Sequence, residues 1–333
     1  MLFSTRYILL FASTLILLLF SFAYSLIAWS SFPLNLSHIS AYFFNFDHQS
    51  IEQQILATTR IPRLLVAILI GTNLAVAGVL MQGLTRNPLA SPSILGINAG
   101  AACFMALASI GINVLGEVSS LVSASVGGLV SGALVIFLGG FFSARSNPLK
   151  LILAGIAINA LLIGITRAAI ILADDRAYSV ITWLSGSLAS MDWQQWQLLW
   201  PTSLVGLVIA AYVAKNLNLL ALGNEVATSL GINIAFTRFL SCIAIILLTA
   251  SSVAVVGPIG FVGLIVPHIA RRLVSNNYLL LLPISALLGS CLIVWADALS
   301  RGIAFPAETP VGVITALIGA PFFVFLSIRS KAL

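Results

Sequence analysis

Ten apolar stretches, each close to the length that crosses a bilayer, constrain the fold of this sequence more than any other feature. A membrane-spanning helix needs roughly 20 mostly apolar residues. The stretches fall at 7–29, 64–82, 94–115, 118–142, 151–172, 197–214, 236–256, 258–274, 279–298 and 311–328. Only 7% of the 333 residues are Asp, Glu, Lys or Arg, which is too few to cover the surface of a soluble globule. The sequence therefore predicts an all-α membrane protein of about ten transmembrane helices, forming a single domain over residues 1–333.

Two of these windows allow a second interpretation. Arg6 precedes the first window, as a basic residue precedes the apolar core of a secretory signal. That window is longer than the roughly 7–15 residues of a signal core, so we expect a retained span. Only Gly257 and Pro258 separate the seventh window from the eighth, so these two could form one broken segment.

The basic residues are distributed unequally between the two sides of the membrane. With the N-terminus inside, the cytoplasmic side carries Arg6, Arg86, Arg145, Lys150, Lys215, Arg238, Arg271, Arg272, Arg329 and Lys331. The outer side carries Arg60, Arg63, Arg167, Arg176 and Arg301. An excess of Lys and Arg in cytoplasmic loops sets orientation, so both termini are predicted to be cytoplasmic. The net charge of +6 forms no basic run, so nucleic acid is not an expected partner and the lipid bilayer is.

Helix-breaking residues interrupt the apolar pattern at three places. These are Asn87-Pro88 with Ser91-Pro92, Asn147-Pro148, and the stretch 257–267. In lipid, irregular backbone is tolerated only where it is buried in protein or lines a cavity. The breaks therefore indicate a translocation pathway.

Motifs of nucleotide-binding and catalytic proteins are missing from the sequence. It contains no G-x-x-x-x-G-K-[ST] loop, no HExxH and no C-x-x-C. Cys103, Cys242 and Cys291 lie singly in apolar windows and are expected to be small buried side chains. If nucleotide drives transport here, another chain must hold the nucleotide.

The longest polar stretch predicted at the cytoplasmic side is 217–233, between the sixth and seventh windows. It is mildly amphipathic, glycine-punctuated and too polar to span the membrane. Two short helices at the cytoplasmic surface would suit this pattern. It can be read as an ordinary connection or as a docking surface for a cytoplasmic partner.

Several motifs in order along the chain resemble one transporter family. They are Arg-Ile-Pro-Arg at 60–63, the segment 82–96 with its Asn-Pro-Leu-Ala, the segment 260–268, and Ala296-Asp297 with Arg301. Together with 217–233 they resemble the FecCD/BtuC family, the permeases of iron-siderophore and vitamin B12 ABC importers, from about residue 50 to residue 328. Within that family, residues 172–178 and 183–186 are most similar to ferric-citrate permeases of the FecC type.

The resemblance implies a BtuC-like type II ABC importer permease fold and a multi-subunit assembly. A second permease, similar or identical, would pair with this chain in the bacterial cytoplasmic membrane. Two ATP-binding subunits would bind ATP and Mg inside, and a substrate-binding protein would dock outside. This chain would hold no cofactor or stable metal site. Its cargo would be an iron(III) chelate such as ferric citrate, with another siderophore, haem or vitamin B12 as alternatives.

The resemblance also assigns roles to individual residues. Contacts with the ATPase are expected from Leu222, Gly223, Glu225, Ala227, Leu230 and Gly231 of the coupling segment 217–233. Arg60, Arg63 and Arg301 match positions that receive acidic residues of the binding protein. Alternatively, these arginines anchor helix ends at lipid headgroups, or Arg301 pairs with Asp297 one turn earlier.

Two gates are expected from the same resemblance. Asn87 and Leu89 match positions at the cytoplasmic constriction, although an Asn-Pro pair can also simply end a helix. The other family gate lies between the fourth and fifth windows, and residues 143–150 there carry no clear match, so this gate stays unassigned.

Arg167 lies inside the fifth apolar window, and an ionisable residue at membrane depth usually faces a cavity or a partner. It could attract an anionic ferric-citrate complex along the pathway. Alternatively, it pairs with Asp174 or Asp175 at the outer interface.

Two other classes of protein fit the sequence less well. An ion-coupled secondary transporter would place acidic residues at the middle of the bilayer, and Asp297 and Glu308 lie at span ends instead. A membrane-embedded enzyme would need a polar catalytic cluster, which the sequence lacks. His268 is expected to be structural rather than a metal ligand.

Overall fold

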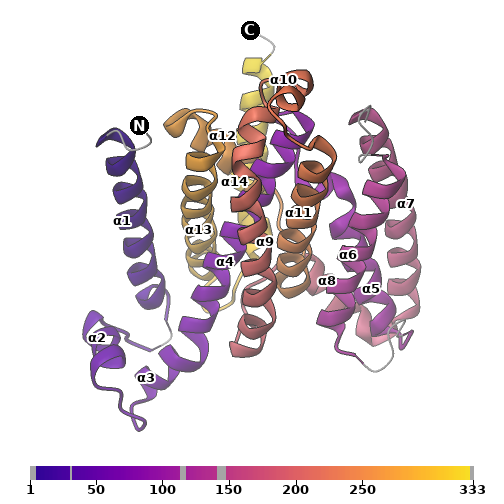
Figure 1. Ribbon diagram of the computed structural model, residues 1–333. Helices are drawn as coiled ribbons and strands as arrows, with labels where there is room; N and C mark the ends of the chain where they lie inside the picture. Colours follow the sequence, from indigo (N-terminus) through magenta and orange to yellow (C-terminus); the bar gives the residue numbers. More distant parts are fainter. Residues whose placement is uncertain (1–4, 31, 113–117, 141–147, 331–333) are drawn as a thin grey trace.

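The computed structural model describes residues 5–30, 32–112, 118–140 and 148–330, and within them the chain is helical with no strand. Among the described residues, seven helices are long and apolar enough to cross a membrane. They are α1 (Thr5–Ile27), α4 (Ile61–Thr85), α6 (Ser120–Leu138), α7 (Pro148–Leu172), α9 (Trp193–Leu220), α11 (Ile234–Val256) and α13 (Tyr278–Ile303). The other three predicted windows contain α5 (Ile97–Ser109), α12 (Val262–Val274) and α14 (Val311–Ser330). Each predicted window thus holds its own helix, and the all-helical membrane fold is confirmed (Figure 1).

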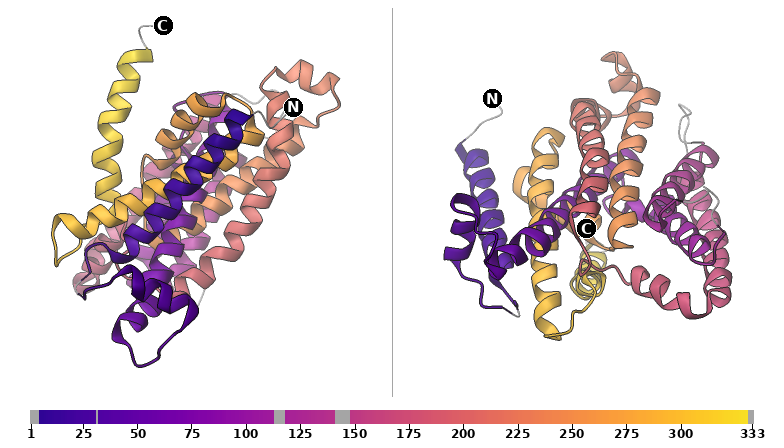
Figure 2. Two further views of the ribbon diagram at one scale, coloured as in Figure 1. Left: turned by 90° about the vertical axis from the view of Figure 1, so that its left-hand side faces the viewer. Right: turned by 90° about the horizontal axis from the view of Figure 1, so that it is seen from below.

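The helices run between two faces of the molecule. The N- and C-terminal ends lie at one face together with the short helix α10 (Asn224–Ser229) (Figure 1). We call this the inner face, because the distribution of basic residues places it in the cytoplasm. The short helices α2 (Leu36–Phe44) and α3 (Ile51–Ile55) lie at the opposite, outer face. In the view from the outer face, α1 and α7 occupy opposite ends of the molecule (Figure 2).

Helix α4 lies at the centre, in contact with α13, α11, α12 and α9. Close packing there depends on pairs of glycines. A Cβ atom on Gly71 would lie 2.2 Å from the backbone oxygen of Gly289 in α13, and one on Gly78 would lie 2.1 Å from that of Gly263 in α12. No real Cβ tolerates such distances, so these positions require glycine. Small residues that let helix backbones approach are a common basis of packing in membranes.

A buried asparagine adds a polar link to this apolar packing. Asn73 of α4 is fully buried, and its side-chain amide donates to the hydroxyls of Ser203 in α9 (2.7 Å) and Ser252 in α11 (3.1 Å). These two bonds link three central helices, while the Asn73 side-chain oxygen has no hydrogen-bond partner among the described residues.

The chain is broken between α11 and α12, at residues 257–261. The seventh and eighth windows are therefore two separate helices. Gly257 has φ +80°, a conformation that favours glycine. Neighbouring backbone braces the break: the Ser187 N–H donates to the Val256 carbonyl at 3.0 Å, and the Gly312 N–H donates to the Gly186 carbonyl at 2.9 Å. Gly257 and Ile259 are buried in protein, whereas Gly260 is exposed, so the irregular backbone is only partly enclosed.

The short outer helices α2, α3 and α8 (Ala177–Leu184) were not predicted from the sequence. A π-helical turn at Leu56–Arg60 joins α3 to α4, so that 35 residues form one helical stretch. At 1.5 Å per residue this stretch is about 52 Å long, well beyond the ~30 Å hydrocarbon core of a bilayer. Its first turns therefore project at the outer face.

Candidate functional site: an outer charged cluster and an inner coupling segment

The outer end of α4 carries a buried arginine that binds two acids. Arg63 Nε and Nη2 donate to Asp297 Oδ1 of α13 at 2.9 and 2.7 Å. Its Nη1 and Nη2 donate to the two carboxylate oxygens of Glu308 at 3.0 and 2.8 Å. The planar guanidinium suits this two-pronged contact. The arrangement ties α4 to α13 and to the segment that leads into α14.

Two further arginines cap the outer end of α1. The last carbonyls of a helix have no partner within it. Arg301 donates to the Ser25 carbonyl and to the Ala28 carbonyl, both at 3.0 Å, and to the Ser25 hydroxyl at 2.8 Å. Arg60 donates to the carbonyls of Ala28 (3.2 Å) and Trp29 (3.1 Å). Positive side chains at this position also complement the negative end of the helix dipole.

We call Arg60, Arg63, Asp297, Arg301 and Glu308 the outer cluster. Arg301 also approaches Asp297 at 3.3 Å, so the ion pair considered in the sequence analysis is present. The side chains of Arg63, Arg301 and Asp297 are buried, whereas that of Glu308 is 33% exposed and Arg60 is half-buried. The three predicted docking arginines therefore lie together, but only Arg60 presents part of its surface outside.

Sequence reasoning missed the pairing of Arg63 with both acids. The partners lie 234 and 245 residues away along the chain, so no local spacing reveals them. One signal was available: Asp297 is an acid within an apolar window, and a carboxylate in such a place needs a cation. Because Arg301, four residues later, already offered Asp297 a cation, no second partner was sought.

The coupling segment differs from its prediction in one respect. Helix α9 continues to Leu220, so a single short helix, α10, follows instead of two. Of the six predicted contact residues, the side chains of Leu222 and Leu230 are 64% and 57% exposed, and Glu225 and Gly231 are also exposed. Gly223 is half-buried at the start of α10. Ala227 is fully buried and anchors α10 to the core, so its side chain is not at the surface.

An arginine joins the predicted gate to this segment. Arg86 ends α4 in the left-handed conformation (φ +50°). Its Nη2 donates to the Leu220 carbonyl at 2.9 Å and to the Asn224 side chain at 2.7 Å. Directly after it, the Asn87 side chain accepts from the Leu89 N–H at 2.9 Å, and both residues are exposed. The other expected gate falls largely on 141–147, outside the described residues.

Arg167 lies on α7, five residues before the outer end of that helix, and is exposed. Of the two acids proposed as alternative partners, Asp174 makes no ion pair with it, and the Asp175 side chain lies outside the described residues. Arg167 therefore lies on a helix face that the other described residues leave uncovered.

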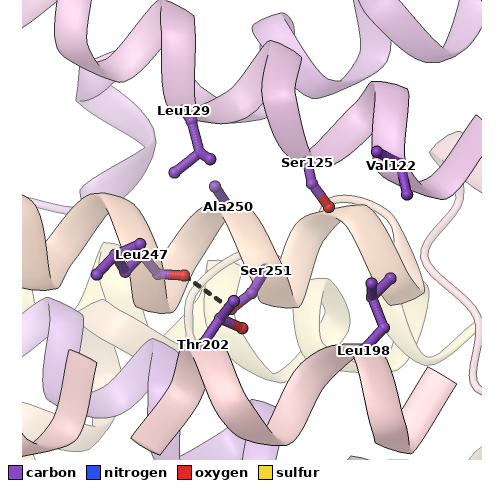
Figure 3. Close-up of a pocket in the computed structure, with 8 residues that line it drawn as sticks. All are labelled: Val122, Ser125, Leu129, Leu198, Thr202, Leu247, Ala250 and Ser251. Atoms are coloured by element: carbon purple, nitrogen blue, oxygen red, sulfur yellow. Dashed lines mark hydrogen bonds between the residues drawn. The ribbon is translucent and has the colours of Figure 1, made fainter. Parts of the chain in front are cut away.

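A cavity of about 130 Å³ between α6, α9 and α11 is unsuited to a charged substrate (Figure 3). Its lining is mainly apolar. The hydroxyls of Ser125, Thr202 and Ser251 donate to carbonyls of their own helices at 3.0, 3.0 and 2.7 Å. No charged side chain of the described residues reaches it.

Metal-binding side chains do not gather anywhere in the part of the chain that the structure describes. No group of three or more His, Cys, Asp or Glu lies close enough together to hold an ion. Cys103, Cys242 and Cys291 are buried, as predicted. His268 packs edge-on against Phe322, with ring centroids 5.9 Å apart.

Comparison with known proteins identifies the family. The sequence profile of the FecCD transport family matches residues 16–329. This chain belongs to the FecCD transport family.

Individual FecCD relatives match over nearly their whole length. The Fe(3+)-citrate import system permease protein YfmD of Bacillus subtilis is 41% identical over 330 residues, which is 99% of this chain and 97% of that protein. The Fe(3+) dicitrate transport system permease protein FecC of Escherichia coli is 41% identical over 311 residues, 93% of each chain. A solved inward-facing metal-chelate type ABC transporter superposes with a TM-score of 0.83 at 31% identity, covering 96% of this chain and 98% of that one.

Membership of the FecCD family fixes the general role. The chain is a multi-pass membrane permease of the ABC transporter type, not a catalytic enzyme. Permeases of this type act with ATPase and substrate-binding partners.

Proposed function

We propose that this chain imports an iron(III) chelate, most specifically ferric citrate, across the cytoplasmic membrane. One observation carries the proposal: two relatives that share 41% identity over at least 93% of the chain are both permeases for Fe(3+)-citrate. Another siderophore, haem or vitamin B12 is the alternative cargo. The iron is substrate and passes through within its chelate.

In this proposal the chain pairs with a second permease in the bacterial inner membrane. Two ATP-binding subunits bind ATP and Mg at the inner face, and a substrate-binding protein delivers the chelate at the outer face. The structure supports a partner at the inner face in particular. Leu222 and Leu230 are apolar and exposed there, and an uncovered apolar surface in water favours a protein partner.

The outer cluster is the proposed docking surface for the binding protein. Arg60 offers its exposed part to an acidic residue of that protein. Arg63 and Arg301 support it by holding α4, α13 and α1 together, and they would reach a partner's carboxylate only by releasing Asp297 or Glu308. The cluster carries three positive and two negative charges, so one positive charge remains for an acid from outside.

At the inner face, Arg86 provides a path from the ATPase to the gate. Movement of α10 would pull on Arg86 through Asn224 and the Leu220 carbonyl. Arg86 immediately precedes Asn87 and Leu89, the proposed cytoplasmic gate. A displacement of the coupling segment would therefore shift the gate residues directly.

The test is uptake of radioactive iron in cells that possess or lack this gene. Iron is offered as ferric citrate and as hydroxamate and catecholate chelates. Selective loss of ferric-citrate uptake on deletion, restored by the gene, supports the proposal. Loss of a different chelate keeps the importer and overturns its cargo. If uptake of all these chelates is unchanged, the iron-chelate cargo is wrong, and the same assay is repeated with haem and corrinoids.

Arg167 is proposed to attract the anionic chelate along the pathway. Uptake by Arg167→Leu and Arg167→Lys variants at matched membrane levels tests this role. We expect the leucine variant to lose most uptake and the lysine variant to keep part of it, since lysine retains the charge. Undiminished uptake in both variants removes the role.

A further inference from the structure

An apolar groove of about 680 Å³ runs along the inner half of α1. Its walls come from three other helices: α9, the end of α12 and the start of α13. Typical lining residues are Phe11 and Leu15 of α1 and Leu280 and Pro283 of α13. The inner half of α1 stands apart from α12 and α13 in Figure 1.

The groove follows from the way α1 is attached. Its outer half is fixed by Arg60 and Arg301, which bind its last carbonyls, and by Trp295, whose indole N–H donates to the Ser21 hydroxyl at 2.8 Å. Its inner half lacks such bonds to the other described helices. Tyr7 and Leu10 of this half still pack against buried apolar residues, and the groove lies beside these contacts, bordered mainly by apolar side chains.

One charged side chain, Lys215 of α9, lies among the described residues that line the groove. It is exposed, and no hydrogen bond or ion pair of its ammonium group occurs in the described part of the chain. Arg6, one residue before the groove-lining Tyr7, is also exposed. No acid lines the groove, so its inner end is positive.

The depth of the groove matches the cytoplasmic leaflet of a bilayer. Tyr7 lies in the first turn of α1, Leu279 in the first turn of α13, and Val274 at the end of α12. From Tyr7 to Leu15 the groove follows eight residues of α1, or about 12 Å. This is close to the thickness of one leaflet's hydrocarbon layer, about 15 Å. Lys215 is five residues from the inner end of α9, where a long side chain reaches the headgroup level.

We propose that this groove binds an anionic glycerophospholipid of the cytoplasmic leaflet. Its acyl chains lie between α1 and α13, and its phosphate pairs with Lys215. The apolar walls offer few hydrogen bonds to a polar ligand, and the positive rim favours an anionic headgroup over a zwitterionic one. The groove shares no residue with the outer cluster or with the coupling segment 217–233.

The test uses the full transporter complex, purified in mild detergent and supplied with phosphatidylglycerol or phosphatidylcholine of identical acyl chains. Native mass spectrometry counts the lipids retained. We expect phosphatidylglycerol to be retained about fivefold better, the factor typical of one basic residue near an anionic surface. Lys215→Gln should remove this preference, and Ala12→Phe, which fills the groove, should lower retention of both lipids.

Lys150→Gln is the matched control, because Lys150 is an exposed lysine on α7, at the other end of the same face. It should leave retention unchanged. Equal retention of the two lipids, or a preference that survives Lys215→Gln, overturns the headgroup assignment. If Ala12→Phe does not change lipid retention, the groove is not the lipid site. The groove would then be open to a protein segment of a partner subunit.

Discussion

The outer cluster and the link around Arg86 at the inner face hold their helices by different kinds of bond. At the outer face, Arg63 and Arg301 are buried and bind Asp297, Glu308 and the end of α1 with charged hydrogen bonds. At the inner face, Arg86 is exposed and binds only neutral groups, while leucines of the coupling segment face outwards. The charges of the outer cluster are bound mainly within the chain, whereas Leu222 and Leu230 at the inner face stay uncovered.

From this contrast we expect the outer end to be rigid and the inner end to move more readily. A buried ion pair is destabilising to break, because the remaining partner is left charged and unpaired. Exposed neutral hydrogen bonds exchange readily with water and contribute less. The following variants test the contrast, ordered from the largest expected effect on stability to the smallest.

Arg63→Met should have the largest effect. It leaves the buried carboxylate of Asp297 without its main partner, and loss of such a partner typically costs about 3–5 kcal/mol. Thermal unfolding of the purified complex, without binding protein, measures it. Arg176→Met is the control, since Arg176 is an exposed outer arginine whose guanidinium donates to the Ser109 carbonyl. Equal melting temperatures for both variants would mean that Arg63 acts in docking alone.

Arg86→Met should lower stability by about 1–2 kcal/mol through the loss of two hydrogen bonds. Its effect on transport should be larger, because the link between α10 and the proposed gate is lost. The ratio of iron uptake to ATP hydrolysis in proteoliposomes reports this uncoupling. Arg272→Met, which removes an exposed arginine from the same face, should keep the normal ratio. A normal ratio in Arg86→Met contradicts the link.

Arg60→Gln should lower stability by about 1 kcal/mol, because Arg301 still binds the Ala28 carbonyl. Affinity for the substrate-binding protein should fall several-fold, and more at low salt, where charged contacts are less screened. Surface plasmon resonance with the complex in nanodiscs measures it. Thr59→Ala, an adjacent exposed change, should bind normally. Unaltered affinity in Arg60→Gln shows that the docking surface lies elsewhere.

Leu222→Ser with Leu230→Ser should change stability least, within about 0.5 kcal/mol, since both side chains are exposed. Co-purification of the ATPase subunit should nevertheless be lost. Ala227→Leu gives the opposite result at the same helix: the buried site has no room, so stability falls first. If the double serine variant retains the ATPase, another surface carries the coupling.

Hydropathy predicted the helices because a segment inside a bilayer must be apolar over most of its length, even where the helix is short, as in the 13-residue α5 and α12. Each apolar window contains a helix, and Gly257 and Arg86 fall at breaks that the glycine and proline pattern anticipated. Helices α2, α3 and α8 were not predicted, because short helices at the membrane surface do not need a long apolar stretch. The coupling segment has one helix instead of two because α9 continues four residues past Asn216.

The candidate site was less accessible to sequence reasoning than the fold. The motif at 60–63 and Arg301 correctly indicated arginines at the outer face, but they did not reveal the internal partners of these arginines. Which acid an arginine meets depends on tertiary packing: Arg63 meets Asp297 because the Gly71–Gly289 contact brings α4 against α13. The spacing of residues along the chain does not predict this contact between α4 and α13.

The outer cluster has a consequence for the order in which the protein is made. Asp297 follows Arg63 by 234 residues. At about 5–20 residues per second, translation of that stretch takes roughly 12–50 s. During this interval the new helix α4 holds an arginine whose final acids do not yet exist, so water or lipid phosphate must accommodate it. Completion of the outer face therefore waits for one of the last helices to leave the ribosome.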